Sequence, residues 1–269
     1  MQPIDLQGIT HWVLPLAALL GACIGSFITL ISYRLPRDEK VGATRSRCPK
    51  CGAQLAARDL LPVLSWVVNF GKCRHCRAAI SSRYIITELL CAIGAAAILY
   101  RYGELSYVTI AYIGLWFVSV AIILTDLEHY LILDEYQIAL ALFGIVFAYT
   151  QDMNALTIIT TMSIALVGSI CVKYLFLLIT KRDGLGWGDI KLFGVVSIWL
   201  PHAIHFAPLL VFAGVLGVAS ACIWRALGKG EVFPFGPAII LSLLVFIFMP
   251  EAYATFWQLY GIKMQFLHP

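Results

Sequence analysis

Charged residues are scarce in this chain. Only 13% of its 269 residues are Asp, Glu, Lys or Arg, whereas 61% are hydrophobic. Soluble globular domains carry about 25% charged residues, so the composition excludes an ordinary soluble domain and indicates a membrane protein. The sequence also lacks the interleaved basic and aromatic residues of a nucleic-acid surface, and we therefore expect no nucleic-acid partner.

Internal repeats, low-complexity tracts and flexible linkers are also missing. A secondary transporter is expected to show inverted repeats with broken helices in two matching halves, so their absence argues against a proton- or cation-coupled carrier. No Lys or Arg precedes the first apolar segment, whereas Arg34 and Arg37 follow it. That charge order is opposite to the order in a cleaved signal peptide, and we expect a retained anchor.

The apolar residues occur in long blocks. A helix needs about 20 apolar residues to cross roughly 30 Å of hydrocarbon, and the blocks have about this length. The pattern predicts an all-α polytopic membrane protein with about eight transmembrane helices. We expect them at 12–33, 84–100, 105–125, 132–150, 155–180, 189–204, 206–227 and 234–256. The expected domains are a first helix (1–33), a loop (34–83) and a membrane domain (84–269).

Positive charge is concentrated in the loop between the first two expected helices. Residues 34–83 hold eleven of the nineteen Lys and Arg residues but only three acids. The positive-inside rule places such a loop in the cytoplasm. We therefore expect an amino terminus outside the cytoplasm, and a loop whose charge meets anionic lipid headgroups.

The loop contains two CxxC pairs, Cys48 with Cys51 and Cys73 with Cys76, separated by 21 residues. Each pair places two thiolates on one turn, a pattern that suits a tetrahedral zinc ion. Disulfides and free thiols are the alternatives, and a reducing cytoplasm argues against disulfides. A closed four-sulfur site leaves no open position for substrate, so the expected Zn²⁺ is structural.

Two acids stand in or beside apolar runs, where an ionisable group is costly and is normally retained for function. Asp126 follows an uncharged run, and Asp189 lies in GLGWGDIKLF behind Gly186 and Gly188. Both fall at expected cytoplasmic helix ends, so they can meet in one plane and share a proton as an acid/base pair. The glycines are expected to allow unusual backbone angles and the close approach of another chain.

Each of these polar residues also has a structural interpretation. Asp189 can cap its helix, and Asp126 can begin a polar turn with Glu128 and His129. Asp134 can cap the next helix or face water. Lys173 is expected to extend toward the cytoplasmic surface.

Several segments, taken in order, resemble the bacterial prepilin peptidases, which are GxGD-type membrane aspartic peptidases. The segments are GSFITLISYRLP (25–36), CPKC, RDLLPVLSW (58–66), CRHC, SSRYIITE (81–88), TDLEHYLILDE (125–135), GLGWGDIKL (184–192) and PFGPAI (234–239). The resemblance covers nearly the whole chain. One departure is Leu133, which stands where we expect proline before the second aspartate of its motif.

The resemblance implies an enzyme of the inner membrane that cleaves the basic leader of type IV prepilins or type II secretion pseudopilins. It assigns catalysis to Asp126 and Asp189, and zinc binding to the four loop cysteines. It also implies N-methylation of the new amino terminus with S-adenosylmethionine, although the sequence contains no glycine-rich βαβ fingerprint. Asp38, Glu39, Asp59 or Glu128 are the acids expected to receive the leader. The rival function is a non-catalytic, zinc-bearing assembly factor of the pilus machinery.

Overall fold

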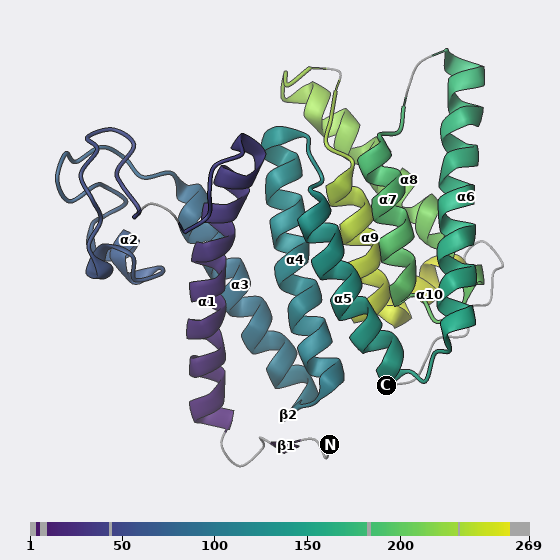
Figure 1. The fold of residues 1–269 in the computed structure, drawn as a ribbon, viewed down its shortest axis with the longest axis horizontal. Helices are drawn as coiled ribbons and strands as arrows, with labels where there is room; N and C mark the ends of the chain where they lie inside the picture. The colour runs from purple at the N-terminus through teal and green to yellow at the C-terminus, as the bar shows by residue number, and fades with distance from the viewer. Residues whose placement is uncertain (1–3, 6–9, 43–44, 182–183, 231, 259–269) are drawn as a thin grey trace. The chain divides into compact units, whose positions relative to one another are not determined.

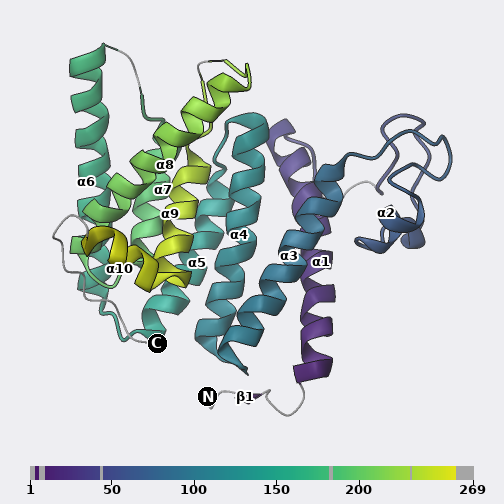
Figure 2. The same cartoon turned by 180° about the vertical axis from the view of Figure 1, so that it is seen from behind.

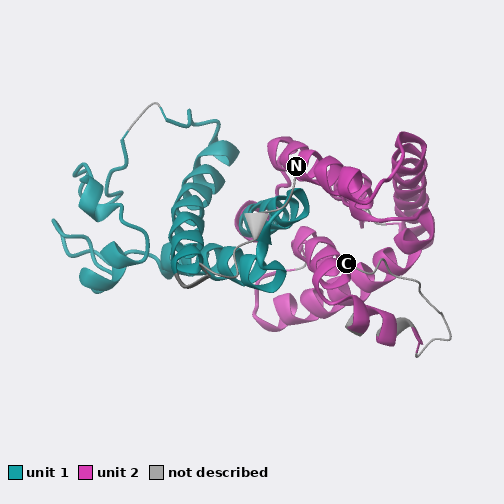
Figure 3. Ribbon diagram, turned by 90° about the horizontal axis from the view of Figure 1, so that it is seen from below, with its two compact units in different colours: residues 1–124 teal, residues 125–269 magenta. Residues whose placement is uncertain are grey.

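The structure is a computed structural model that describes residues 4–5, 10–42, 45–181, 184–230 and 232–258. Nearly all of the regular structure is helical (Figures 1 and 2). The chain forms two compact units, residues 1–124 and 125–269 (Figure 3). The division falls inside helix α4 (Tyr107–His129), and the domain boundaries at 33/34 and 83/84 stay predictions.

The first unit contains two long helices, the loop between them and most of α4. Its elements besides α4 are β1 (Ile4–Asp5), α1 (Thr10–Arg34), η2 (Leu35–Arg37), η3 (Ala57–Asp59), α2 (Leu64–Val68), α3 (Ser82–Tyr102) and β2 (Glu104–Leu105). Strand β1 precedes α1, strand β2 follows α3, and the two form a small antiparallel pair in which Ile4 is opposite Leu105.

Helices α1 and α3 pack closely because glycines on α1 face α3. A Cβ atom at Gly21 would lie 2.6 Å from the carbonyl oxygen of Cys91, and one at Gly25 would lie 2.8 Å from the Cα of Glu88. Small residues four apart allow this approach of two backbones in a membrane. The spacing GACIG was therefore a usable signal for this contact.

The described residues of the second unit form six further α-helices. They are α5 (Asp134–Thr150), α6 (Ala155–Thr180), α7 (Trp187–Val196), α8 (Phe206–Ala226), α9 (Gly236–Phe248) and α10 (Pro250–Gln258), with short 3-10 turns η4 (Ser197–Trp199) and η5 (Ala203–His205). Trp199 is fully buried; its indole N–H donates to the carbonyl oxygen of Leu140 at 3.3 Å, and its ring stacks on Phe147 at 5.2 Å between centroids. This contact joins α5 to the turn that follows α7.

Five helices in the described part of the chain are long and apolar enough to cross a membrane. They span Trp12–Arg37, Ser82–Tyr102, Tyr107–His129, Ala155–Thr180 and Ala203–Ala226, and Gly236–Phe248 is a shorter apolar helix. These agree with five of the expected positions and with a multi-pass membrane protein. Large apolar side chains on the outside of α6, including Ile159, Val167, Leu178 and Ile179, suit contact with lipid.

The remaining three expected spans are shorter or interrupted. Expected span 132–150 is the 17-residue helix α5. Expected span 189–204 is the ten-residue helix α7 followed by η4 and an extended Leu200. Expected span 234–256 breaks at Met249 into α9 and α10. Pro201 and Pro250 explain the two breaks, since proline cannot continue a helix from the preceding residue.

Candidate functional site

Asp126 lies in the last turn of α4 with only 4% of its surface exposed. Its Oδ2 accepts a hydrogen bond from the backbone N–H of Gly236, at 2.8 Å. Gly236 begins α9, and its amide belongs to the first turn of that helix, where backbone donors lack helical partners. The PFGPAI segment thus supplies a donor from residue 236 to a carboxylate 110 residues earlier.

The fit at Gly236 leaves no room for a larger residue. A Cβ atom there would lie 2.7 Å from Asp126 Oδ2 and 3.2 Å from Cδ1 of Ile132. Real Cβ atoms do not approach an oxygen this closely, so the absence of a side chain at residue 236 is what allows its amide to reach the carboxylate.

Asp189 is half-buried in the first turn of α7. Its Oδ2 accepts from the backbone N–H of Gly186 at 3.1 Å, which is the capping role considered above. The prediction that the glycines adopt unusual backbone angles is wrong for Gly186, which is extended (φ −68°, ψ 155°). Gly188 also has no left-handed φ, and the glycines serve close approach instead, because a Cβ at Gly186 would lie 3.0 Å from Asp189 Oδ2.

The second unit brings the two aspartates together. Their carboxylates interact electrostatically, and the side chain of Ile132 connects their surroundings. Cβ positions built on Gly188 and Gly236 would lie 3.5 Å and 3.2 Å from Ile132, so one apolar side chain contacts the backbone beside each acid. The arrangement is a pair of carboxyl groups, each fixed by a backbone amide, around an apolar side chain.

Lys173 does not extend to the surface as expected. It is buried on α6, with 5% of its surface exposed, and its ammonium donates to the carbonyl oxygen of Leu185 at 2.5 Å. The ammonium also lies 5.5 Å from the ring centre of Trp187 and interacts electrostatically with Asp189. Lys173 thus holds the GLGWGD segment against α6, a role that the sequence did not reveal.

Asp134, the second aspartate of the TDLEHYLILDE segment, lies in a different environment from Asp126. It is in the first turn of α5, and its carboxylate forms an exposed ion pair with Lys191, at 2.9 and 3.0 Å. The side-chain amide of Gln137 also donates to it, at 3.4 Å. Asp134 is thus paired with Lys191 on an exposed surface, whereas Asp126 is the acid that interacts electrostatically with Asp189.

Leu133 replaces the expected proline without changing the backbone. It precedes α5 with φ −71° and ψ 141°, and proline holds φ near −65°. The approach to α5 therefore keeps the conformation that proline would impose.

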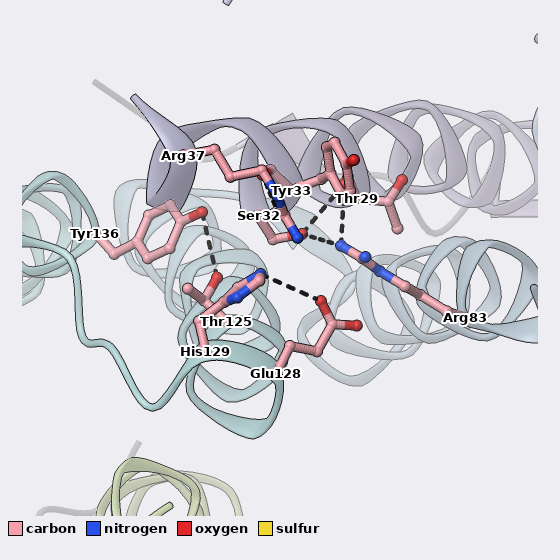
Figure 4. Close-up of polar contacts among 9 residues, drawn as sticks. All are labelled: Thr29, Ser32, Tyr33, Arg37, Arg83, Thr125, Glu128, His129 and Tyr136. Carbon is pink, nitrogen blue, oxygen red and sulfur yellow. Dashed lines mark hydrogen bonds and ion pairs between the residues drawn. The ribbon is translucent and has the colours of Figure 1, made fainter. Parts of the chain in front are cut away.

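Other polar residues near the end of α4 form local contacts (Figure 4). Glu128 Oε2 lies 3.9 Å from His129 Nε2, and the Thr125 hydroxyl donates to that of Tyr136 at 3.5 Å. In the first unit, Arg83 joins α3 to α1: one of its terminal nitrogens donates to the Ser32 hydroxyl at 2.7 Å and to the Thr29 carbonyl at 3.2 Å.

The two CxxC pairs fold into matching knuckles. In the first, the Cys48 N–H donates to the Ala53 carbonyl and Gly52 N–H donates back to the Cys48 carbonyl, both at 2.9 Å. In the second, Cys73 N–H donates to the carbonyl of Ala78 and Arg77 N–H to that of Cys73. The residue after each pair has positive φ, 71° at Gly52 and 59° at Arg77.

The knuckles bring the four predicted ligands together. The sulfur atoms of Cys48, Cys51, Cys73 and Cys76 all lie within 4.8 Å of one another. The Cys48 and Cys76 sulfurs are 3.9 Å apart, far beyond the ~2.05 Å of a disulfide and near the edge of about 3.8 Å of a tetrahedron with Zn–S distances of about 2.3 Å. None of the eight cysteines, all within the described residues, forms a disulfide, and the distances between the four sulfurs fit a four-sulfur metal site.

The surroundings of the knuckle thiols change their pKa values in opposite directions. Backbone N–H groups of Cys51 and Lys50 point at the Cys48 sulfur and lower its pKa to about 6. The Cys51 pKa is about 11: the N–H of Ala53 lowers it, but burial and the neighbouring sulfurs outweigh that effect. Four thiolates at this spacing repel one another, and a divalent cation would stabilise them together.

Of the acids expected to receive a basic leader, Asp59 is already engaged. Its Oδ1 lies 3.1 Å from the Nε of Arg74, and only 8% of the Asp59 side chain is exposed. The ion pair joins the segment before α2 to the second knuckle. Asp59 is therefore a structural residue of the loop.

Comparisons with known proteins identify the family of the chain. Residues 19–102 match the Bacterial Peptidase A24 N-terminal domain, and residues 110–223 match the Type IV leader peptidase family. The chain is 31% identical to a prepilin leader peptidase/N-methyltransferase from Dichelobacter nodosus, over 90% of this chain and 93% of that protein. It is 29% identical to one from Stutzerimonas stutzeri, with the same coverage, and 27% identical to one from Pseudomonas aeruginosa, over 91% and 93%.

No solved structure matches the chain. The family matches nevertheless include both the cysteine loop and the two aspartates, and the similarity extends over about nine-tenths of the chain. The chain belongs to the prepilin leader peptidase/N-methyltransferases of the Type IV leader peptidase family.

Proposed function

We propose that the protein is a membrane aspartic endopeptidase that removes the leader peptide of type IV prepilins or type II secretion pseudopilins, and then N-methylates the new amino terminus. The observation that carries the peptidase is the pair of carboxyl groups in the second unit. Asp126 is held by the Gly236 amide, Asp189 by the Gly186 amide, and the two interact electrostatically.

Two nearby carboxyl groups divide the work of peptide hydrolysis, since one keeps its proton while the other ionises. The ionised member takes a proton from a water molecule whose oxygen attacks the scissile carbonyl carbon. The protonated member donates a hydrogen bond to the carbonyl oxygen, where negative charge develops. The tetrahedral intermediate then loses its C–N bond as the nitrogen takes a proton, which leaves a carboxylate on the leader and a free amine on the pilin.

The fixed positions of the carboxyl groups matter because acid/base catalysis requires hydrogen-bond reach to the reacting atoms. The amides of Gly186 and Gly236 occupy one oxygen of each acid. Lys173 and Ile132 hold the segment around Asp189 in place. This chain's own residues thus pre-organise the pair before substrate arrives.

The cysteine loop supports the methylation half of the proposal. Cys48, Cys51, Cys73 and Cys76 would hold a Zn²⁺ that supplies a fixed cross-link between the knuckles and no reactive position. S-adenosylmethionine would donate the methyl group to the amine released by cleavage, with S-adenosylhomocysteine as the second product.

The proposed topology has about eight membrane spans, with α5, α7 and α9 as short or interrupted ones. The amino terminus is outside, and the loop and both aspartates are at the cytoplasmic side of the inner membrane, by the positive charge of residues 34–83. A prepilin inserted by its hydrophobic helix presents its scissile bond at the same surface.

The test uses purified full-length protein in nanodiscs, a synthetic prepilin and S-adenosylmethionine, with the products identified by mass spectrometry. We expect a product that lacks the leader and carries one methyl group on its amino terminus. An uncut substrate in an otherwise folded, zinc-loaded sample would favour the assembly factor. A cut but unmethylated product would retain the peptidase and remove the methyltransferase.

A further inference from the structure

The loop between α1 and α3 exposes a cluster of apolar side chains that the proposed chemistry does not use. The cluster, here termed the α2 surface, consists of Leu60, Leu61, Leu64, Val67, Val68 and Phe70, with 44 to 84% of each residue exposed. All six fall within eleven residues around α2. Water-exposed loops of soluble proteins rarely gather such a patch, and an exposed apolar patch usually marks a binding surface.

A buried acid of α3 holds this surface in place. Glu88 is 6% exposed, and its Oε2 accepts the backbone N–H of Val63 at 2.7 Å. Val63 is the residue immediately before α2 and adopts φ 61°, a conformation that a β-branched residue avoids unless its surroundings enforce it. The hydrogen bond therefore fixes where α2 starts.

The same bond sets the depth of the α2 surface. Glu88 lies six residues inside α3, which begins at Ser82, and six residues of helix cover about 9 Å at 1.5 Å each. Figures 1 and 2 show α2 to the side of α1 and α3, in the loop that connects them. The carboxylate that holds Val63 thus belongs to a residue about 9 Å along α3 from its first residue, in a helix that is apolar and long enough to span a membrane.

The chemistry of the loop identifies what covers the surface. Both ends of the loop are attached to helices that can span the membrane, so lipid is present at all times. Eleven basic residues against three acids in 34–83 complement anionic headgroups. An interfacial segment buries its apolar side about 5–10 Å into the boundary of headgroups and acyl chains, a range that includes the position of Glu88 along α3.

We propose that residues 60–70 form a monotopic membrane-inserted element: the α2 surface lies in the cytoplasmic lipid leaflet, and Glu88 holds it there through the amide of Val63. The occupant of the surface is lipid, not a protein partner. The zinc knuckles are then attached to the membrane at a third point besides α1 and α3, which restrains them close to the bilayer surface. This inference requires α3 to span the membrane and does not depend on either catalytic activity.

The test places a fluorescent non-natural amino acid at Phe70, and in a second protein at Gln54, an exposed position of the first knuckle. This label leaves the native tryptophans and cysteines in place. Each full-length, zinc-loaded protein is reconstituted in nanodiscs of a phosphatidylcholine and phosphatidylglycerol mixture, with or without brominated acyl chains. We expect bromine to quench the label at residue 70 at least threefold more than the label at residue 54.

Glu88→Gln supplies the second measurement. A neutral amide accepts the Val63 N–H more weakly, so the quenching at residue 70 should fall by about half while the zinc content stays constant. Equal, weak quenching at residues 70 and 54 would overturn the proposal. Weak quenching of residue 70 that changes only when prepilin is added would also overturn it, and would identify the surface as a substrate-docking site.

Discussion

At the scale of single residues, the site depends on glycine amides as much as on the two acids. Gly236→Ala places a Cβ 2.7 Å from Asp126 Oδ2, so the carboxyl group or the start of α9 must move. A displacement near 1 Å can lower catalysis about 100-fold, and we expect prepilin cleavage to fall roughly 10- to 100-fold. The matched control is Gly214→Ala on α8, where an added Cβ contacts nothing within 4 Å. Equal activity of the two variants would contradict this role of Gly236.

At the scale of elements, Lys173 joins α6 to the segment that carries Asp189. Lys173→Met keeps the length of the side chain but leaves the buried Leu185 carbonyl without its ammonium donor, at a cost of about 1–3 kcal/mol. We expect a lower Tm and a roughly tenfold loss of cleavage. Lys181→Met, at the exposed end of the same helix, serves as the control. A Lys173→Met enzyme with unchanged stability and rate would show that the buried ammonium is dispensable.

The turn before α5 allows a stabilising change. Leu133→Pro should raise the free energy of unfolding by about 0.4–1 kcal/mol, because the native φ of −71° already suits proline and the unfolded chain loses freedom. Ile132→Pro is the contrasting variant, since it removes the side chain that contacts both glycine segments. Thermal unfolding in nanodiscs measures both, and a lower Tm for Leu133→Pro would refute the equivalence of the turn.

Features that depend on local sequence could be predicted, whereas contacts between distant residues could not. The long helices and the CxxC knuckles depend on apolar runs and short spacings, and both were predicted. Asp126 and Asp189 were selected by cost in an apolar environment. The amide of Gly236 and the Leu185 carbonyl are neutral backbone groups, so no composition signal marks them as partners of Asp126 and Lys173. The expected span 189–204 extends past the end of η4 at Trp199, although Pro201 marks the break in the sequence.

At the scale of the whole molecule, the four-cysteine cluster and the acid pair lie in different compact units. Cys73→Ser should therefore abolish zinc binding and lower methylation at least tenfold, while cleavage falls much less. Cys222→Ser makes the same substitution at an exposed position of α8 and should change neither activity. Zinc content, cleavage and methylation are measured on each preparation, and parallel loss of both activities in Cys73→Ser would contradict their separation.

The central claim is the acid pair, and asparagine variants test it most directly. Asp126→Asn and Asp189→Asn preserve side-chain size and a carbonyl oxygen that can accept from Gly236 or Gly186, but neither can exchange a proton. Asp134→Asn removes only the exposed ion pair with Lys191 and is the control. We measure cleavage of a synthetic prepilin by the unmodified protein and the three variants, each folded and in nanodiscs. We predict at least a 1,000-fold loss in each of the first two variants and less than a threefold loss in Asp134→Asn. Cleavage that survives in either Asp126→Asn or Asp189→Asn would contradict the role of the acid pair.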